Sequence, residues 1–93
     1  MSTVEQLSRE TVVDAVRRLV VAESRQPIDP ATVPEKERLD GKLLRMSSID
    51  VVWLLVRLED DLVVRLPNDI FVGRRFRTVA DFADAVLDGA QAR

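Results

Sequence analysis

The fold is decided by the stretch Ser47-Ser48-Ile49-Asp50-Val51-Val52-Trp53-Leu54-Leu55-Val56-Arg57-Leu58-Glu59-Asp60-Asp61-Leu62, which carries the strongest helical pattern in the chain. A serine ahead of the apolar run and an acidic residue in the first turn both suit a helix N-terminus, where they meet unpaired N–H groups and the positive end of the dipole. We expect a helix over about residues 48–63. It should end before Pro67, because proline disfavours helical geometry in the residue that precedes it.

This helix carries two apolar faces. One face holds Val51, Leu54, Leu55, Leu58 and Leu62, and the other holds Ile49, Val52, Trp53 and Val56. A helix in so small a protein needs only one apolar face for its core, so the second face is a candidate surface for partners.

The residues on either side of this helix predict an otherwise helical protein. Apolar residues at helical spacing predict a first helix over about residues 4–23, with Ser8 or Thr3 as its N-cap. Three prolines within 27–34 and Gly41 then predict a long ordered loop over 24–47, with room for one helical turn in 35–45. Apolar residues are expected to pin this loop over the core, namely Ile28, Val33, Leu39, Leu43 and Leu44.

The C-terminal third completes the pattern. A short third helix is expected around residues 70–72, followed by a basic run whose arginines, Arg74, Arg75 and Arg77, suit a solvated loop. Thr78 with Asp81 three residues later resembles a capping box and predicts a closing helix that stops near Gly89. Strand patterns are weak, so the expected fold is all-α: a small four-helix bundle with three main helices and a short one.

Composition narrows the possible functions. The chain has 93 residues with no cysteine and no histidine, which excludes a disulfide frame, a thiolate or imidazole catalyst and a cysteine or histidine metal site. Its length predicts a single domain over residues 1–93. A net charge of −2 disfavours nucleic acid as a partner. With no signal peptide and no long apolar run, we expect a cytoplasmic protein with no membrane association.

The central helix also identifies a family. The segment from Ser47-Ser48-Ile49-Asp50 to Leu62, then Leu66-Pro67 and Thr78-Val79-Ala80-Asp81-Phe82, resembles acyl carrier proteins, in which a D-S-L motif opens the second helix. In that family the motif serine receives 4′-phosphopantetheine, whose thiol holds an acyl group as a thioester. The resemblance implies a carrier and not an enzyme, so no catalytic residue and no metal ligand is expected.

Spacing distinguishes the two serines. The family places its serine directly before an apolar residue and an Asp, and nineteen positions before the proline after helix two, which matches Ser48 and Pro67. Ser47 then stands where the family usually has Asp, a carboxylate that belongs to the surface met by the phosphopantetheinyl transferase. The structural alternative is that both serines cap the helix, the commonest role of serine at such a position.

The resemblance further implies a docking surface for partner enzymes along this helix. Asp50, Glu59 and Asp60 match acidic positions of the family's recognition helix, although solvated acids on a helix face are common without any partner. Trp53 stands where the family commonly has Glu. The family register places Trp53 outward as a docking anchor, whereas a lone tryptophan is more often buried. The predicted docking residues are Ser47, Ile49, Asp50, Val52, Trp53, Val56, Glu59 and Asp60.

The function predicted from the sequence is a stand-alone acyl carrier protein of polyketide or other specialised biosynthesis. Its expected partners are a phosphopantetheinyl transferase and acyl-loading or acyl-processing enzymes such as an acyltransferase or ketosynthase, which it visits as a monomer. Two alternatives stay open: an aminoacyl or peptidyl carrier, and an unmodified carrier-like domain that binds a partner through Val52, Trp53 and Val56. A small helical DNA-binding domain is a third, disfavoured by the net charge.

Overall fold

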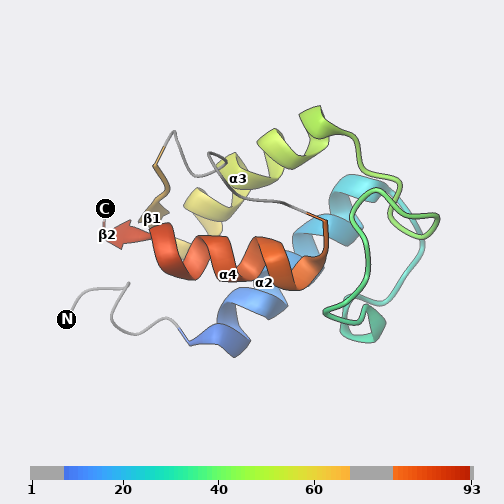
Figure 1. The fold of residues 1–93 in the computed structure, drawn as a ribbon, viewed down its shortest axis with the longest axis horizontal. Helices are drawn as coiled ribbons and strands as arrows, with labels where there is room; N and C mark the ends of the chain where they lie inside the picture. The colour runs from blue at the N-terminus through green and yellow to red at the C-terminus, as the bar shows by residue number, and fades with distance from the viewer. Residues whose placement is uncertain (1–7, 68–76, 93) are drawn as a thin grey trace.

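Helices dominate the computed structural model, which describes residues 8–67 and 77–92. Within those residues the elements are α2 (Arg9–Ser24), the 3₁₀ helix η1 (Pro30–Thr32), α3 (Ser48–Leu62), β1 (Val64–Arg65), α4 (Val79–Gly89) and β2 (Gln91–Ala92) (Figure 1). The expectation of a mostly helical chain is therefore confirmed. The short helix expected around residues 70–72, together with Arg74 and Arg75, lies outside the described residues.

Helix α2 begins later than its sequence pattern predicts. Ser8 is extended, and its side chain accepts a hydrogen bond of 3.1 Å from the N–H of Thr11, so Ser8, one of the two predicted N-caps, is the N-cap of α2. The helix predicted over residues 4–23 is therefore not continuous through Ser8, and residues 4–7 lie outside the described residues. A serine side chain that accepts a hydrogen bond from the backbone can fix the first residue of a helix, even where apolar spacing continues ahead of it. The valines on one face, among them Val12, Val16 and Val20, are fully buried.

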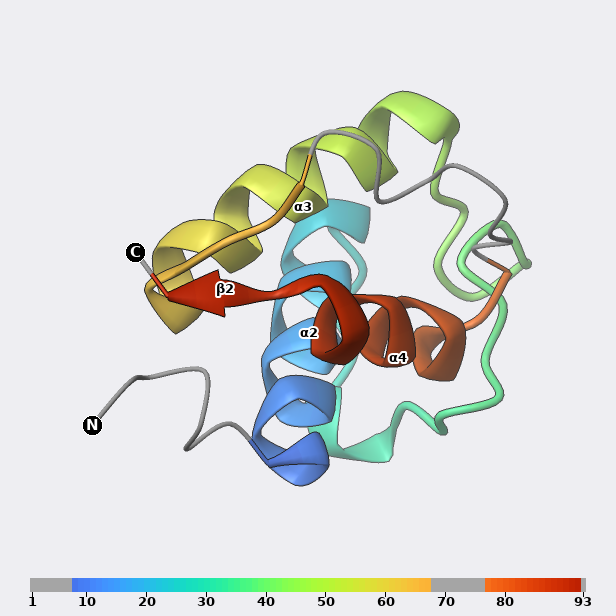
Figure 2. The same cartoon turned by 60° about the vertical axis from the view of Figure 1, so that its left-hand side comes forward.

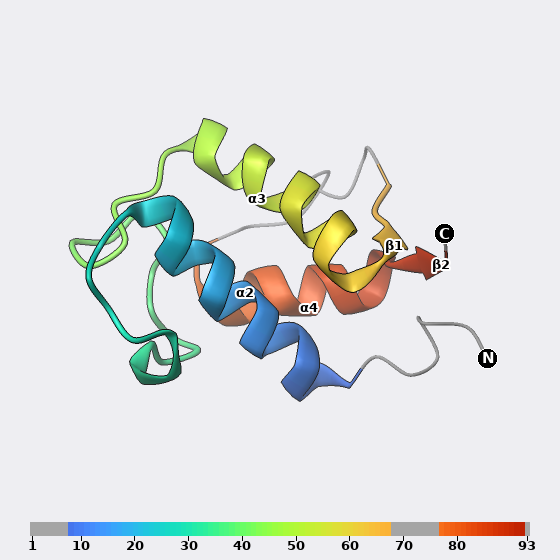
Figure 3. The ribbon, with the colours of Figure 1, turned by 180° about the vertical axis from the view of Figure 1, so that it is seen from behind.

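Helix α2 packs against both other long helices, as three views of the ribbon show (Figures 1, 2 and 3). Two ion pairs join it to α3, Arg18 with Asp61 at 3.1 Å and Glu23 with Arg57 at 3.2 Å. Later residues of α2 thus meet earlier residues of α3, so these two helices run antiparallel. Apolar residues from all three helices and the loop form one core, with Phe82 of α4 its largest fully buried side chain.

The segment 25–47 is the long ordered loop that its prolines predict. Val33, Leu39 and Leu44 are buried as expected and Ile28 is partly buried, whereas Leu43 is 38% exposed, which corrects its expected place over the core. The stretch 35–45 forms turns, and the N–H of Arg45 donates to the carbonyl of Gly41 at 2.8 Å, the i to i−4 bond of the single helical turn that the sequence allows here. The loop is tied to the start of α4, where the N–H groups of Val79 and Ala80 donate to loop carbonyls.

Both ends of α4 follow the sequence pattern. Thr78 and Asp81 form the expected capping box, and the helix ends at Gly89 with Ala90 as its C-cap. Beyond it, residues 91–92 pair antiparallel with β1, with Val64 opposite Ala92. Strands of two residues are too short to show an alternating pattern, so sequence reasoning did not predict this pairing. Within 8–67 and 77–92, no helix is long and apolar enough to span a membrane.

Candidate functional site

The N-terminus of α3 is closed by a reciprocal pair of side chains. The N–H of Asp50 donates to Ser47 Oγ at 3.4 Å, and the N–H of Ser47 donates to Asp50 Oδ2 at 2.8 Å, which makes a capping box. The Ser47 hydroxyl also donates to Asp50 Oδ2 at 2.9 Å. The predicted capping role therefore belongs to Ser47, with Asp50 as its partner.

Ser48 is the first residue of α3 and is exposed. In the described parts of the chain its hydroxyl has no hydrogen-bond partner, and neither its N–H nor that of Ile49 has an acceptor. Unpaired N–H groups at a helix start favour a negatively charged group there, as does the helix dipole. Ser48 thus combines an accessible hydroxyl with surroundings that suit a phosphodiester.

The carboxyl of Asp50 is held in its charged form by this geometry. The backbone N–H of Ser47, and then its hydroxyl, hold the pKa of Asp50 below its usual range, and the nearby Arg25 adds a smaller effect in the same direction. Hydrogen bonds to a carboxylate favour the ionised form. Asp50 is thus primarily part of the helix cap, although sequence reasoning listed it as a docking residue.

The outward side of α3 carries a continuous row of apolar side chains. Ile49 is 61% exposed, Trp53 is 56% exposed, and Val52 and Val56 are each nearly half exposed; we call these four residues the α3 apolar face. On the opposite side Leu54, Leu58 and Leu62 are buried, while Leu55 and Val51 are partly buried. The orientation predicted from the family register is therefore confirmed, and the alternative of a buried Trp53 is wrong.

The acidic residues of α3 are less available than a solvated strip would be. Glu59 is half-buried, and its carboxylate accepts a bond of 3.0 Å from the N–H of Leu66 at the helix exit. Asp60 is exposed and is engaged in an interaction within the chain. No signal in the sequence indicated that Glu59 binds the backbone seven residues later, because that bond depends on how the chain turns after α3.

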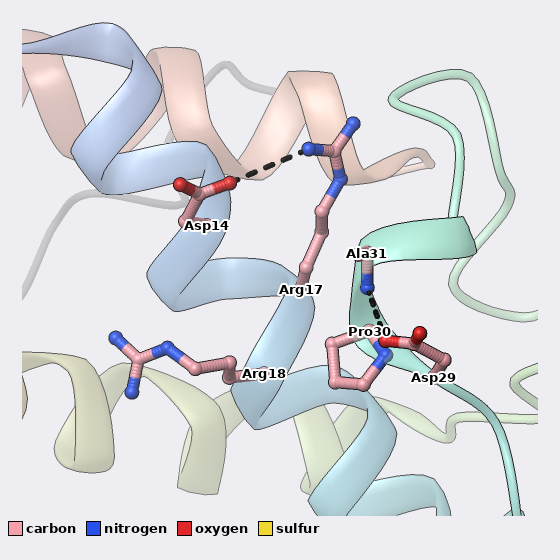
Figure 4. A pocket seen from close by; sticks show the side chains of 6 residues that line it. All are labelled: Asp14, Arg17, Arg18, Asp29, Pro30 and Ala31. Atoms are coloured by element: carbon pink, nitrogen blue, oxygen red, sulfur yellow. Dashed lines mark hydrogen bonds and ion pairs between the residues drawn. The ribbon is translucent and has the colours of Figure 1, made fainter.

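A cleft lies beside α2, away from Ser48. Its lining includes Arg17, Arg18 and Asp14 of α2 and Asp29, Pro30 and Ala31 at η1 (Figure 4). Arg17 donates to the carbonyl of Val33 at 2.8 Å and pairs with Asp14 at 3.4 Å, while the Asp29 carboxylate accepts from the N–H of Ala31 at 3.0 Å. These groups hold the loop on α2, and none of the predicted site residues lies here.

Other charged groups also bear on expectations from the sequence. Within the described ranges, no group of three or more Asp and Glu side chains could hold a metal ion. Of the arginines in the basic run, Arg77 is described and exposed, and its N–H donates to Asp81 at 3.1 Å.

Comparisons with known proteins add no further likeness. The sequence matches no family model and no curated protein, and the fold matches no solved structure. The resemblance to carrier proteins consequently rests on the residues between Ser47 and Phe82, and the functional inference rests on the geometry around Ser48.

Proposed function

We propose that the protein is a stand-alone acyl carrier protein whose Ser48 bears 4′-phosphopantetheine and which shuttles an acyl thioester between enzymes of polyketide or other specialised biosynthesis. It is a carrier and not an enzyme, because the chemistry resides in the thiol of the arm. The fold proposed with it is the four-helix carrier bundle, of which α2, α3 and α4 would be the three main helices.

The observation that carries this proposal is that the two serines differ in role: Ser47 caps α3, and the Ser48 hydroxyl is exposed and has no partner among the described residues. Ser47 and Asp50 form the capping box, so Ser48 is not needed as a cap, while the N–H groups of Ser48 and Ile49 have no acceptor among the described residues. Helix capping, the structural alternative for both serines, thus explains Ser47 but does not explain Ser48. The family usually has Asp at the position of Ser47. Serine and aspartate are both good N-cap residues, so this difference preserves the cap.

The proposed modification is one group transfer. The Ser48 oxygen attacks the β-phosphorus of coenzyme A, the new Oγ–P bond forms, and the bond to the nucleotide phosphate breaks and releases adenosine 3′,5′-bisphosphate. The hydroxyl proton is lost to the transferase, which also supplies Mg²⁺. On the carrier side, the unpaired N–H groups of Ser48 and Ile49 favour the new negative charge.

The α3 apolar face lies next to this serine and supports the docking role proposed with it. Ile49 directly follows Ser48, and Val52, Trp53 and Val56 continue along the same side of the helix. The proposed partners are the transferase and the acyltransferase or ketosynthase enzymes that load and process the acyl group. Ser47, Asp50, Glu59 and Asp60 border this face and complete the proposed docking set.

Two other functions use the same features. An aminoacyl or peptidyl carrier would share the fold and Ser48, and would differ only in its load. An unmodified interaction module is favoured by the exposure of Trp53 within the α3 apolar face, because exposed apolar patches are typical of interaction surfaces whether or not Ser48 is modified.

The test is intact-protein mass spectrometry after incubation with coenzyme A, Mg²⁺ and a broad-specificity phosphopantetheinyl transferase. We expect the wild type to gain one phosphopantetheine and Ser48→Ala to gain none. Ser47→Ala is the matched control, because it removes the neighbouring hydroxyl and the helix cap yet should still be modified. If the wild type gains no mass with any transferase of its source organism, the carrier proposal is wrong and the interaction module replaces it.

A further inference from the structure

We propose that the α3 apolar face extends to Val63 and docks by apolar burial, with little contribution from charge pairing, into an uncharged apolar pocket of the transferase that modifies Ser48. This inference rests on the proposed function. The inference adds to the proposed function the type of contact, the chemistry of the complementary surface and one additional residue, Val63.

The exposed apolar side chains gather on one element. Among the residues that the structure describes, six large apolar side chains are exposed, and all but Leu43 lie on α3 or at its C-cap. Val63 is 54% exposed and follows Val56 by seven residues, about two helical turns, so its Cα lies on the same side of α3 just beyond the last helical residue. The row therefore runs from Ile49, beside Ser48, to the exit of α3, with Asp60 at the same helical spacing between Val56 and Val63.

The charges beside this row are already engaged within the chain. Asp50 belongs to the capping box, and Asp61 pairs with Arg18 at 3.1 Å. Glu59 holds the N–H of Leu66, and Arg57 pairs with Glu23 at 3.2 Å. Asp60 also has an interaction partner. A partner that docked through its basic groups would have to compete with these contacts, whereas an apolar pocket would leave them intact.

Val63 is held in a backbone conformation that its side chain disfavours. It has φ 54° and ψ 51° at the C-cap of α3, the left-handed region where glycine is unstrained and a β-branched residue is an outlier. Its side chain is also exposed, so core packing does not compensate for the strain. Docking would give this apolar side chain a role that the folded monomer does not.

The size and position of the face identify the occupant. Five partly exposed side chains offer a few hundred Å² of apolar surface, below the about 800 Å² per partner of a stable interface, so a permanent dimer of this chain is disfavoured. A transient partner fits this size. Because the row starts at the residue after Ser48, an enzyme that reaches the Ser48 hydroxyl must cover part of it.

The experiment measures steady-state loading of the full chain by a broad-specificity transferase between about 0.05 M and about 0.5 M NaCl, a range over which surface charge pairs are increasingly screened. The KM for the carrier should change less than about twofold, since apolar contacts are not screened. The kcat at saturating carrier reports any effect of salt on the enzyme itself.

Three variants test the residues. Trp53→Ala should raise the KM by about tenfold or more, as loss of an aromatic anchor does. Val63→Gly should raise the KM about threefold while it raises the melting temperature, a combination that a merely structural residue would not produce. Leu43→Ala, the exposed apolar residue off the helix, is the control and should leave the KM unchanged.

The outcomes separate the two proposals. A KM that climbs steeply with salt and is indifferent to Trp53→Ala would overturn apolar docking while the carrier function stands. A Val63→Gly protein that is only more stable, with an unchanged KM, would remove Val63 from the face. If the wild type is not loaded at any salt concentration, the carrier function fails and the docking inference fails with it.

Discussion

Ser47 and Asp50 exchange hydrogen bonds across the first turn of α3, with the Ser47 N–H 2.8 Å from Asp50 Oδ2 and the Asp50 N–H 3.4 Å from Ser47 Oγ. This pair places the next hydroxyl, that of Ser48, at a helix start that already has its capping box. Ser47 thus contributes to the stability of the helix, and Ser48 is the proposed site of modification. Substituting each serine separately distinguishes these two roles.

The first prediction compares the two serines by stability. Ser47→Ala should lower the free energy of unfolding by about 1 kcal/mol, the usual value of an N-cap side chain. In a domain of this size the melting temperature should then fall by about 4 to 8 °C. Ser48→Ala should change it little, because the Ser48 hydroxyl is exposed and has no partner among the described residues. Thermal unfolding followed by circular dichroism checks both variants, and equal losses would contradict the assignment of the cap.

The second prediction concerns acid pH. The pKa of Asp50 is lowered in the folded protein, chiefly by the N–H of Ser47 and then by its hydroxyl. A carboxyl whose folded pKa lies below its unfolded value contributes stability above the unfolded pKa of about 4 and loses it as the pH falls through the folded pKa. Asp50→Asn should therefore be less stable than the wild type near neutral pH.

The acid limb of the same titration is the control. Below the folded pKa the wild-type carboxyl is protonated and resembles the amide of Asp50→Asn, so the two stabilities should converge. Denaturant unfolding of both proteins between about pH 2 and about pH 7 measures this difference. A difference that stays constant across that range would show that Asp50 acts through shape alone.

The sequence predicted those parts of the fold that depend on local pattern. Ser47, Thr78 and Gly89 mark helix ends through their own backbone and side-chain chemistry, and the structure has α3 and α4 beginning and ending within a residue or two of the expected positions. The sequence left Ser8 and Thr3 open as N-caps because apolar spacing continues ahead of Ser8; in the structure the Ser8 side chain accepts a bond from the N–H of Thr11, and α2 begins at Arg9.

The candidate site also contains some features that were predicted and others that could not be. The outward orientation of Trp53 was predicted by the resemblance to the family, whereas the apolar pattern alone favoured a buried tryptophan. The bond between Glu59 and the N–H of Leu66 and the left-handed conformation of Val63 could not be predicted, because both depend on how the chain turns after α3. The pairing of β1 with β2 joins residues far apart in the sequence and left no local pattern.

The third prediction uses two adjacent residues of α3. Leu54 is completely buried and Trp53 is 56% exposed, although they are neighbours in sequence. Leu54→Ala should lower the free energy of unfolding by about 2 to 5 kcal/mol through lost burial and a cavity. Trp53→Ala should change it by no more than about 0.5 kcal/mol, as is usual for surface positions. Urea denaturation of both variants measures the contrast, and a large loss in Trp53→Ala would mean that Trp53 belongs to the core.

The fourth prediction concerns the strained exit of α3. Placing an L-residue in the left-handed region costs about 1 to 2 kcal/mol, and glycine avoids this cost but loses about 0.5 to 1 kcal/mol through the greater freedom of its unfolded chain. Val63→Gly should therefore stabilise the protein by roughly 0.5 to 1 kcal/mol, measured as a rise in melting temperature of a few degrees.

Arg25 provides the matched control for this prediction, since it occupies the equivalent C-cap of α2 with φ 60°. Both residues donate their backbone N–H back to the helix, Arg25 to Val21 and Val63 to Glu59, so glycine preserves the cap bond at either site. Arginine is unbranched at Cβ and tolerates the left-handed region better than valine. Arg25→Gly should consequently gain less than Val63→Gly. The reverse order, or a loss of stability in Val63→Gly, would show that the Val63 side chain stabilises the folded monomer and would remove strain as an argument for its part in docking.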